Sequence, residues 1–271
     1  MLKAYQVFNK KIPSWYEVDD LKVYSSQSLQ QASSERTALY KAALIEAFNA
    51  KSGADLCGGL GIDTYFLSQK CQKWYFIEQH LARAKDAEHN FRQLGVEHIE
   101  VVPTSADEWL VESEPVDLYY MDPDRRPNSN KRVFLLEECS PNPIEVLKML
   151  PAESWKLVKT SPMLDLTEGF EKLLATEVHL LSVANELKEL LWVVPPKSKQ
   201  INHRRCVPHE LIYAWEHQFI DMLNSTNASI LVEHPFEARA GSYFYVPSTL
   251  QAKLNTAYLE AKHYGLVSVS K

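Results

Sequence analysis

The chain has 271 residues, of which 45% are hydrophobic, and a formal net charge of -6. A chain of this length and composition can bury a substantial core, so we expect one large globular domain or one domain with a smaller attachment. The negative charge argues against tight nonspecific binding to nucleic acid, because that binding depends mainly on cations that meet phosphates.

Three further classes are disfavoured by the sequence. No apolar run approaches the roughly 20 residues that a bilayer-spanning helix needs, so no membrane role is predicted. The 4 cysteines and 9 histidines show no ligand spacing, so no metal site is predicted. Met1 is followed by a polar stretch where a signal segment would be apolar, and we expect a cytoplasmic protein.

The predicted elements alternate between helix and strand. Ser34 is placed to cap a helix over residues 35–49, with Leu39, Ala42, Ala43 and Glu46 at helical spacing. From residue 54 onward, short apolar strands alternate with helical stretches, which predicts an α/β fold with a doubly wound sheet. The predicted strands are 54–57, 73–78, 99–103, 116–122, 156–161, 177–184 and 189–194.

The last two predicted strands are joined by only Asn185 to Lys188. This connection is too short for a helical crossover, so the two strands should pair antiparallel. A seven-stranded, mostly parallel sheet that ends in such a hairpin is typical of Rossmann-like methyltransferases and not of the all-parallel dinucleotide-binding sheet. We expect a helical lead-in at 1–50, the methyltransferase-like domain at 51–200 and a small appendage at 201–271.

The segment ADLCGGLGID ends the first predicted strand with three glycines. Glycines permit positive backbone dihedrals, close approach of a ligand and free amides at a helix start. The turn is therefore a candidate cofactor site, although a tight strand-to-helix connection explains it equally well. Its candidate contacts are Asp55, Cys57, Gly58, Gly59, Gly61 and Asp63.

Two acidic residues favour the cofactor interpretation. Glu78 ends the second strand, 17 residues beyond Gly61, where a carboxylate can accept hydrogen bonds from both ribose hydroxyls. Asp107 follows the third strand, where it can meet the amino group of an adenine or simply lie in the first turn of a helix. A nicotinamide enzyme would favour a third glycine, and Thr64 stands there, which disfavours a dehydrogenase.

The fourth strand leads into Asp122-Pro123-Asp124-Arg125-Arg126, at the edge where α/β sheets carry their chemistry. Asp122 and Pro123 resemble the start of the Asp/Asn-Pro-Pro-aromatic turn of amine methyltransferases, in which the target amine donates hydrogen bonds to the turn. Asp124 and Arg125 replace the second proline and the aromatic residue, so the target atom stays open. The candidate catalytic residues are Asp122, Pro123, Asp124 and Arg125.

Three cations are candidates for substrate binding. The planar guanidinium groups of Arg125 and Arg126 can stack on a base or hold a phosphate of RNA, or they can pair with nearby carboxylates and stiffen the loop. Lys159, after the fifth strand, can bind a phosphate or serve as a surface cation. Asp165 nearby can order the substrate loop or cap a helix.

With these motifs, the chain resembles the THUMP-like-domain class I methyltransferases, a family of bacterial proteins regarded as RNA methyltransferases. The resemblance rests on Lys11-Ile12-Pro13 with Trp15, Gln31, Ser33-Ser34-Glu35 with Thr37, DLCGGLGIDT, Asp122 to Arg126, Glu138 to Pro141, Lys159 to Asp165 and Asn185 to Leu191. It implies S-adenosylmethionine as cofactor and an RNA substrate, and it makes Ser34 and Thr37 cofactor contacts in addition to a helix cap.

The chain also departs from this family. Cys57, Asp124 and Thr160 replace the residues expected there, and the usual amino-terminal domain is lacking. The segment from about Ser242 resembles the opening of the THUMP-like unit and then stops. Two alternatives stay open: a noncatalytic RNA-binding or scaffold protein on this fold, and an amine methyltransferase that acts on DNA or a small molecule.

Overall fold

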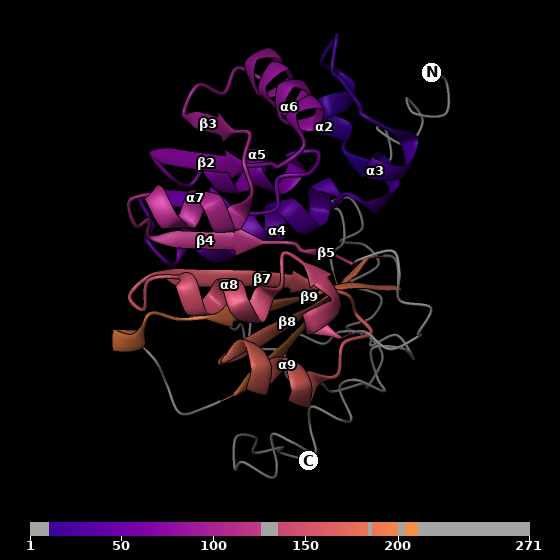
Figure 1. The fold of residues 1–271 in the computed structure, drawn as a ribbon. Coiled ribbons are helices and arrows are strands. Elements are labelled where there is room, and N and C mark those ends of the chain that lie inside the picture. Colours follow the sequence, from indigo (N-terminus) through magenta and orange to yellow (C-terminus); the bar gives the residue numbers. More distant parts are fainter. Residues whose placement is uncertain (1–10, 126–134, 184–185, 200–203, 211–271) are drawn as a thin grey trace. The chain divides into compact units, whose positions relative to one another are not determined.

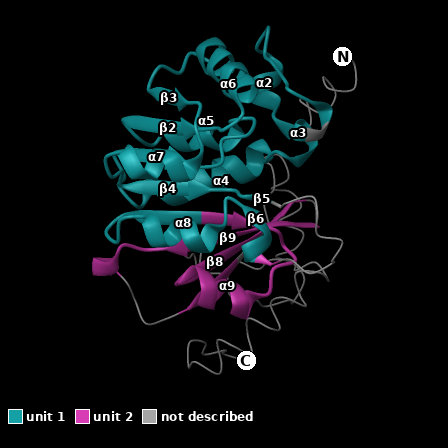
Figure 2. Ribbon diagram, in the orientation of Figure 1, with its two compact units in different colours: residues 1–127, 136–157 teal, residues 128–135, 158–271 magenta. Residues whose placement is uncertain are grey.

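The computed structural model describes residues 11–125, 135–183, 186–199 and 204–210. Arg126 and the predicted appendage beyond residue 210 therefore lie outside the described residues. The chain divides into two compact units, one of residues 1–127 and 136–157 and one of residues 128–135 and 158–271 (Figure 2). The domain limits expected at residues 50 and 200 stay a prediction.

The first unit is built on four parallel strands in the order β4-β1-β2-β3. Their bounds are β1 Ser52–Asp55, β2 Lys73–Ile77, β3 Ile99–Val102 and β4 Leu118–Met121. Asp55 pairs with Phe76 on β2 and with Tyr120 on β4, so the carboxyl ends of three strands reach the same edge. Ligands of open α/β sheets bind outside this edge.

Helices connect these strands, as parallel pairing requires (Figure 1). They are α5 Ile62–Ser68, α6 Leu81–Gln93 and α7 Ala106–Glu112, and a further helix, α8 Pro143–Met149, comes later in the chain. After β4 the chain forms β5 Asp124–Arg125, which pairs antiparallel with β6 Cys139–Ser140 after a short 3-10 helix, η1 Leu136–Glu138.

From residue 11 onward, three helices precede the sheet: α2 Pro13–Tyr16, α3 Ser26–Gln31 and α4 Glu35–Glu46. Ser34 caps α4, as predicted, by accepting a hydrogen bond from the Thr37 amide. The predicted stripe on α4 was wrong in part, because Leu39 is 49% exposed and Glu46 is exposed. Besides apolar residues, the buried face carries Thr37 and Lys41, which a hydrophobic period does not detect.

The amino-terminal helices belong to the core of the first unit. Ile12 and Trp15 pack in one cluster with Ala38 and Ala42 of α4 and Phe66 of α5. The burial of several large side chains there, at roughly 1.5–3 kcal/mol each, holds the amino-terminal segment against α4 and α5. Residues 11–50 are thus an integral part of the first unit.

The second unit contains β8 Glu177–Val183, β9 Glu186–Val194 and β10 Arg205–Glu210, with α9 Leu166–Leu173 and the 3-10 helix η2 Lys197–Lys199. Strand β7, Trp155–Thr160, divides between the units. Strands β8 and β9 pair antiparallel, as predicted from their short connection. That connection is even shorter than expected, because Glu186, Leu187 and Lys188 already belong to β9.

The α/β class, with its mostly parallel sheet, is confirmed, but among the described residues that sheet has eight strands, not seven. The additional strand is β10, which pairs parallel with β8. Its sequence Arg205 to Glu210 contains Pro208, which cannot donate to a ladder and therefore argues against a strand. An edge strand tolerates a proline, and β10 stands at the end of the strand order.

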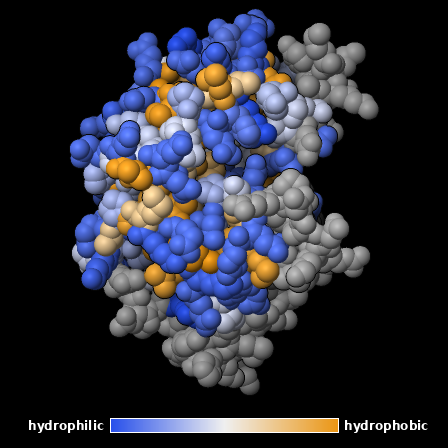
Figure 3. Space-filling model, in the orientation of Figure 1, coloured by the Kyte–Doolittle hydropathy of each residue, from blue (hydrophilic) through white to orange (hydrophobic). Residues whose placement is uncertain are grey.

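On the face in Figure 3, hydrophilic residues predominate and exposed hydrophobic ones are scattered in small groups. Among the largest exposures are those of Val111, Met163 and Leu174, at 77%, 66% and 66%. Within the residues that the structure describes, no helix has the length and apolar character to cross a membrane.

Candidate functional site

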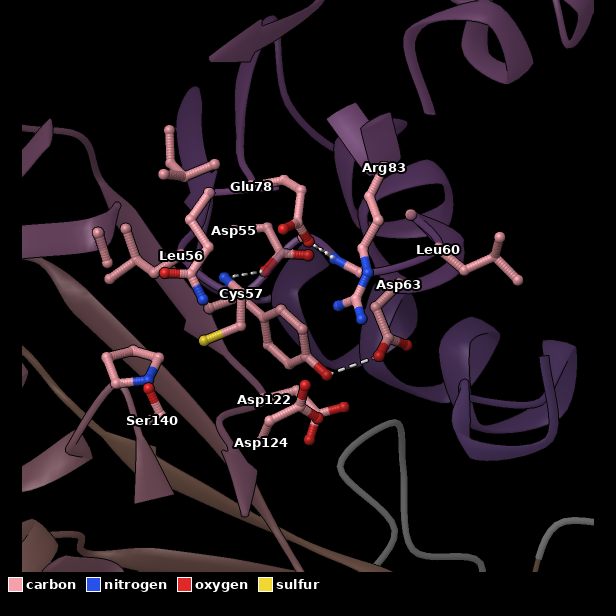
Figure 4. Close-up of a pocket in the computed structure, with 18 of the residues that line it drawn as sticks. Asp55, Leu56, Cys57, Leu60, Asp63, Glu78, Arg83, Asp122, Asp124 and Ser140 are labelled. Atoms are coloured by element: carbon pink, nitrogen blue, oxygen red, sulfur yellow. Dashed lines mark hydrogen bonds between the residues drawn. The ribbon is translucent and has the colours of Figure 1, made fainter. Parts of the chain in front are cut away.

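A cavity of about 680 Å³ opens at the carboxyl edge of the parallel strands, and every residue that lines it belongs to the first unit. Its wall combines the glycine turn after β1, the ends of β2 and β4, the amino-terminal segment from Tyr24 to Ser33 and the start of α7. Labelled acidic side chains from these different elements gather around it in Figure 4.

The glycine turn is shaped by contacts that exclude side chains. A Cβ at Gly58 would lie 2.4 Å from the Phe76 ring, and one at Gly61 would lie 2.7 Å from the Phe91 ring. Gly59 and Gly61 have positive φ angles of 60° and 82°, which side chains disfavour. The turn therefore brings backbone to the cavity wall and starts α5 there.

Asp55 fixes the start of this turn. Its Oδ1 accepts from the Cys57 amide at 2.9 Å, and its Oδ2 accepts from the Thr64 hydroxyl at 2.7 Å. Burial raises the pKa of Asp55 to about 7, against the lowering effect of these two hydrogen bonds. Thr64, at the position of the missing third glycine, thus holds the turn through its hydroxyl. Burial also raises the pKa of the Cys57 thiol well above its usual value.

Glu78, directly after β2, is oriented by backbone donors. The Gly59 amide donates to Oε2 at 3.0 Å and the His80 amide donates to Oε1 at 2.8 Å. A carboxylate oxygen has room for further hydrogen bonds, so each oxygen can still accept from a ligand. Glu78 as a whole is 6% exposed and lines the cavity, as its predicted role requires.

Asp63 lies at the centre of a buried polar network. Lys41, fully buried on α4, places its Nζ 2.9 Å from Asp63 Oδ1 and donates to the Ser33 hydroxyl at 3.1 Å. The hydroxyls of Ser33 and Tyr120 both donate to Asp63 Oδ2 at 2.6 Å. Four segments, around α3, α4, α5 and β4, thus meet at one carboxylate. Ser33, Asp63 and Tyr120 line the cavity.

The predicted reaction edge closes another side of the cavity. Asp122 and Asp124 line it, and Pro123 joins them between β4 and β5. Asp107 lines it as well, in the first turn of α7, whose cap is Ser105. The backbone of Arg125 belongs to β5, and its side chain, like the whole of Arg126, lies outside the described residues.

Four predicted residues whose side chains the structure describes are not among those that line the cavity: Ser34, Thr37, Pro123 and Lys159. Ser34 and Thr37 bond to each other at the start of α4, which is the cap alternative. Lys159 belongs to the second unit, where its Nζ lies 3.9 Å from Glu189 Oε2. It is only 11% exposed, so it is no surface cation. Asp165 caps α9 by accepting from the Glu168 amide.

Several lining residues were missed by sequence reasoning. Ser33 is next to the predicted Ser34, and only its packing distinguishes the two. Tyr120 had a usable signal, because residues two apart on a strand share a face and Asp122 had been identified. Arg83 on α6, whose guanidinium lies 5.2 Å from the Tyr24 ring centre, gave no local pattern.

The wall of the cavity is strongly acidic. Among its described side chains, Arg83 is the one cation. Seven acidic side chains line it: Asp55, Asp63, Glu78, Asp107, Asp122, Asp124 and Glu145. A cavity with this excess of acceptors and negative charge suits a ligand that carries hydroxyls and positive charge.

The structure is similar to the crystal structure of a proposed methyltransferase from Porphyromonas gingivalis W83. The TM-score is 0.64 at 30% identity, over 72% of this chain and 48% of that protein, so the chain spans about half the length of that relative. This similarity confirms the Rossmann-like α/β class. No family model matches the chain, and no curated protein does.

Two more distant structures have TM-scores too low to support an argument. One is a 16S rRNA methyltransferase of T. thermophilus in complex with AdoMet and guanosine, at 14% identity over 66% of this chain and 45% of that chain, with a TM-score of 0.44. The other is a proposed methyltransferase from Streptococcus mutans in complex with SAH. It has 14% identity over 56% of this chain and 95% of that chain, with a TM-score of 0.38.

Proposed function

We propose that the chain is an S-adenosylmethionine-dependent methyltransferase. The observation that carries the proposal is Glu78, which lines the cavity after β2 and is oriented by the Gly59 amide of the glycine turn. A carboxylate fixed in this way can accept hydrogen bonds from both hydroxyls of a ribose. The Rossmann-like fold and the similarity to the P. gingivalis protein support the same class.

The hydrogen-bond acceptors in the cavity wall fit this cofactor. Its ribose would bind at Glu78, and Asp107 would accept from the adenine amino group. When bound, the cofactor would supply an activated methyl group on its sulfonium, so the protein needs mainly to align the nucleophile with it. Asp122 would accept a hydrogen bond from the attacking amine and so orient its lone pair.

Calorimetry tests this function directly. We expect the purified chain to bind S-adenosylmethionine, and Glu78→Gln to weaken binding at least about tenfold because a charged hydrogen-bond acceptor is lost. Glu112→Gln, at an exposed position on α7, is the matched control and should bind as the wild type does. Absence of wild-type binding would refute the proposal.

The substrate that we propose is RNA. Asp122-Pro123-Asp124-Arg125-Arg126 supports this, because two adjacent guanidinium groups suit a polyanion better than a neutral metabolite. We expect transfer of a tritiated methyl group to total RNA from cells that lack the protein, and loss of transfer with Asp122→Ala. Transfer to DNA or to a metabolite pool instead would favour the amine methyltransferase alternative. Cofactor binding without any transfer would favour the noncatalytic one.

A further inference from the structure

The hydroxyl protons of Ser33 and Tyr120 are both committed to one acceptor. Each hydroxyl donates to Asp63 Oδ2 at 2.6 Å. In Figure 4 the dashed line to Asp63 is the bond from the tyrosine hydroxyl. A hydroxyl has one proton and two lone pairs, so an oxygen that has given its proton can only accept other hydrogen bonds. Both oxygens therefore offer lone pairs, and not a donor, to the cavity that they line.

Lys41 keeps this arrangement in place. Its Nζ lies 2.9 Å from Asp63 Oδ1 and donates to the Ser33 oxygen at 3.1 Å, and its side chain is fully buried. The ammonium compensates the charge of Asp63, so the carboxylate can stay ionised and hold both hydroxyl protons. Lys41 does not line the cavity, so it acts on this wall through Asp63 and Ser33.

We propose that the Ser33 and Tyr120 oxygens form the acceptor pair for a primary ammonium group of the ligand. On the proposed function, on which this inference rests, that group is the α-ammonium of the methionine part of S-adenosylmethionine. An ammonium carries three donors and no acceptor, which complements two oxygens that offer only lone pairs. Glu78 lies at the end of another strand, so ribose and ammonium would bind at different parts of the wall. Lys41 is a positioning residue for the pair.

Two ligands distinguish binding of the ammonium group from binding of the rest of the cofactor. S-adenosylhomocysteine carries the ammonium, and 5′-methylthioadenosine has the same nucleoside and sulfur but lacks the amino acid. We expect Tyr120→Phe and Ser33→Ala each to weaken S-adenosylhomocysteine at least about tenfold in calorimetry, as for a lost hydrogen bond to a charged group. Both variants should bind 5′-methylthioadenosine as the wild type does.

Matched controls exist for both substitutions. Tyr119, the neighbour on β4, is 1% exposed and its hydroxyl accepts from the Val116 amide away from the cavity, so Tyr119→Phe removes a buried bond but no cavity group. Ser68→Ala, at the fully buried end of α5, is the control for Ser33. Neither control should change the affinity for either ligand.

The outcomes are distinct. Equal weakening of both ligands, or unchanged binding of S-adenosylhomocysteine, overturns the acceptor pair while leaving the proposed function standing. A wild-type chain that binds neither ligand refutes the proposed function and this inference with it. Thermal unfolding of each variant shows whether it folds; should Tyr120→Phe unfold, Ser33→Ala decides between these outcomes.

Discussion

The ammonium of Lys41 lies 2.9 Å from the carboxylate of Asp63, and the lysine side chain is fully buried. This pair joins the helix before the first strand to the helix after the glycine turn. We expect Lys41→Met to lower the free energy of unfolding by about 3–5 kcal/mol, because it removes the cation that lies 2.9 Å from a buried carboxylate. Urea unfolding measures this loss.

The double variant Lys41→Met with Asp63→Asn should recover much of that stability, since it removes both charges together. The control is Lys70→Met, which removes an exposed ion pair with Glu46 and should cost at most about 1 kcal/mol. Equal losses for Lys41→Met and Lys70→Met would contradict a compensating role of the buried pair.

The packing of Gly58 against Phe76 predicts a second effect. Gly58→Ala places a methyl group 2.4 Å from the ring, and we expect a loss of about 1–3 kcal/mol in urea unfolding, as for other overpacked sites. Gly95→Ala is the comparison, because that glycine also has a positive φ but nothing lies within 4 Å of the added Cβ. It should cost only about 1 kcal/mol. The double variant Gly58→Ala with Phe76→Leu should regain part of the stability, because the smaller side chain at position 76 leaves room for the added methyl group.

The buried carboxyl of Asp55 predicts a pH dependence of stability. Burial raises its pKa in the folded protein to about 7 from 3.8, so between these values the folded state keeps a proton that the unfolded chain has lost. The contribution of this proton is fully present below about pH 4 and is lost as the pH rises through 7. It amounts to roughly 4 kcal/mol.

Asp55→Asn mimics the protonated form and should remove this part of the dependence. The measurement is urea unfolding of both proteins from pH 4 to pH 8, where the difference between the two curves isolates Asp55 from the other carboxyls. Parallel curves over this range would mean that Asp55 does not retain its proton.

The thiol of Cys71 should react slowly. Burial, together with the nearby charge of Asp117, raises its pKa to about 11 from 9.0. At pH 8 its thiolate fraction is then roughly a hundredfold below that of an ordinary thiol, and the thiolate is the reactive form. Mass spectrometry of iodoacetamide-labelled peptides should show this slow rate in the folded protein and a normal rate in urea. A fast rate in the folded protein would contradict the burial of the thiol.

The sheet was predictable because its strands follow local rules. Short apolar runs between helical stretches predicted seven strands, and the structure has a strand at each of those positions. The short link after β8 predicted its antiparallel pairing with β9. Strand β10 was missed because its sequence is polar and contains Pro208, and its pairing with β8 depends on a partner more than twenty residues away along the chain.

The cavity was predictable only in part. Asp55, Glu78, Asp107 and Asp122 follow strands whose carboxyl ends share one edge, so their order along the chain sufficed to place them there. Ser34 and Thr37 were chosen from a resemblance, yet it is Ser33 that lines the cavity. Which of these two neighbouring serines faces the cavity depends on tertiary packing, and no local sequence pattern predicts it.

Local sequence patterns account for the alternation of elements, the glycine turn and the acidic residues at the strand ends, because backbone propensity and strand direction act over a few residues. The network around Asp63 depends instead on how the chain packs. Its members, Ser33, Lys41 and Tyr120, lie as much as 87 residues apart, and a lysine in a helix normally indicates a solvated face. Burial of the Asp63 charge requires a cation and hydroxyl donors, and only the packed fold brings them together.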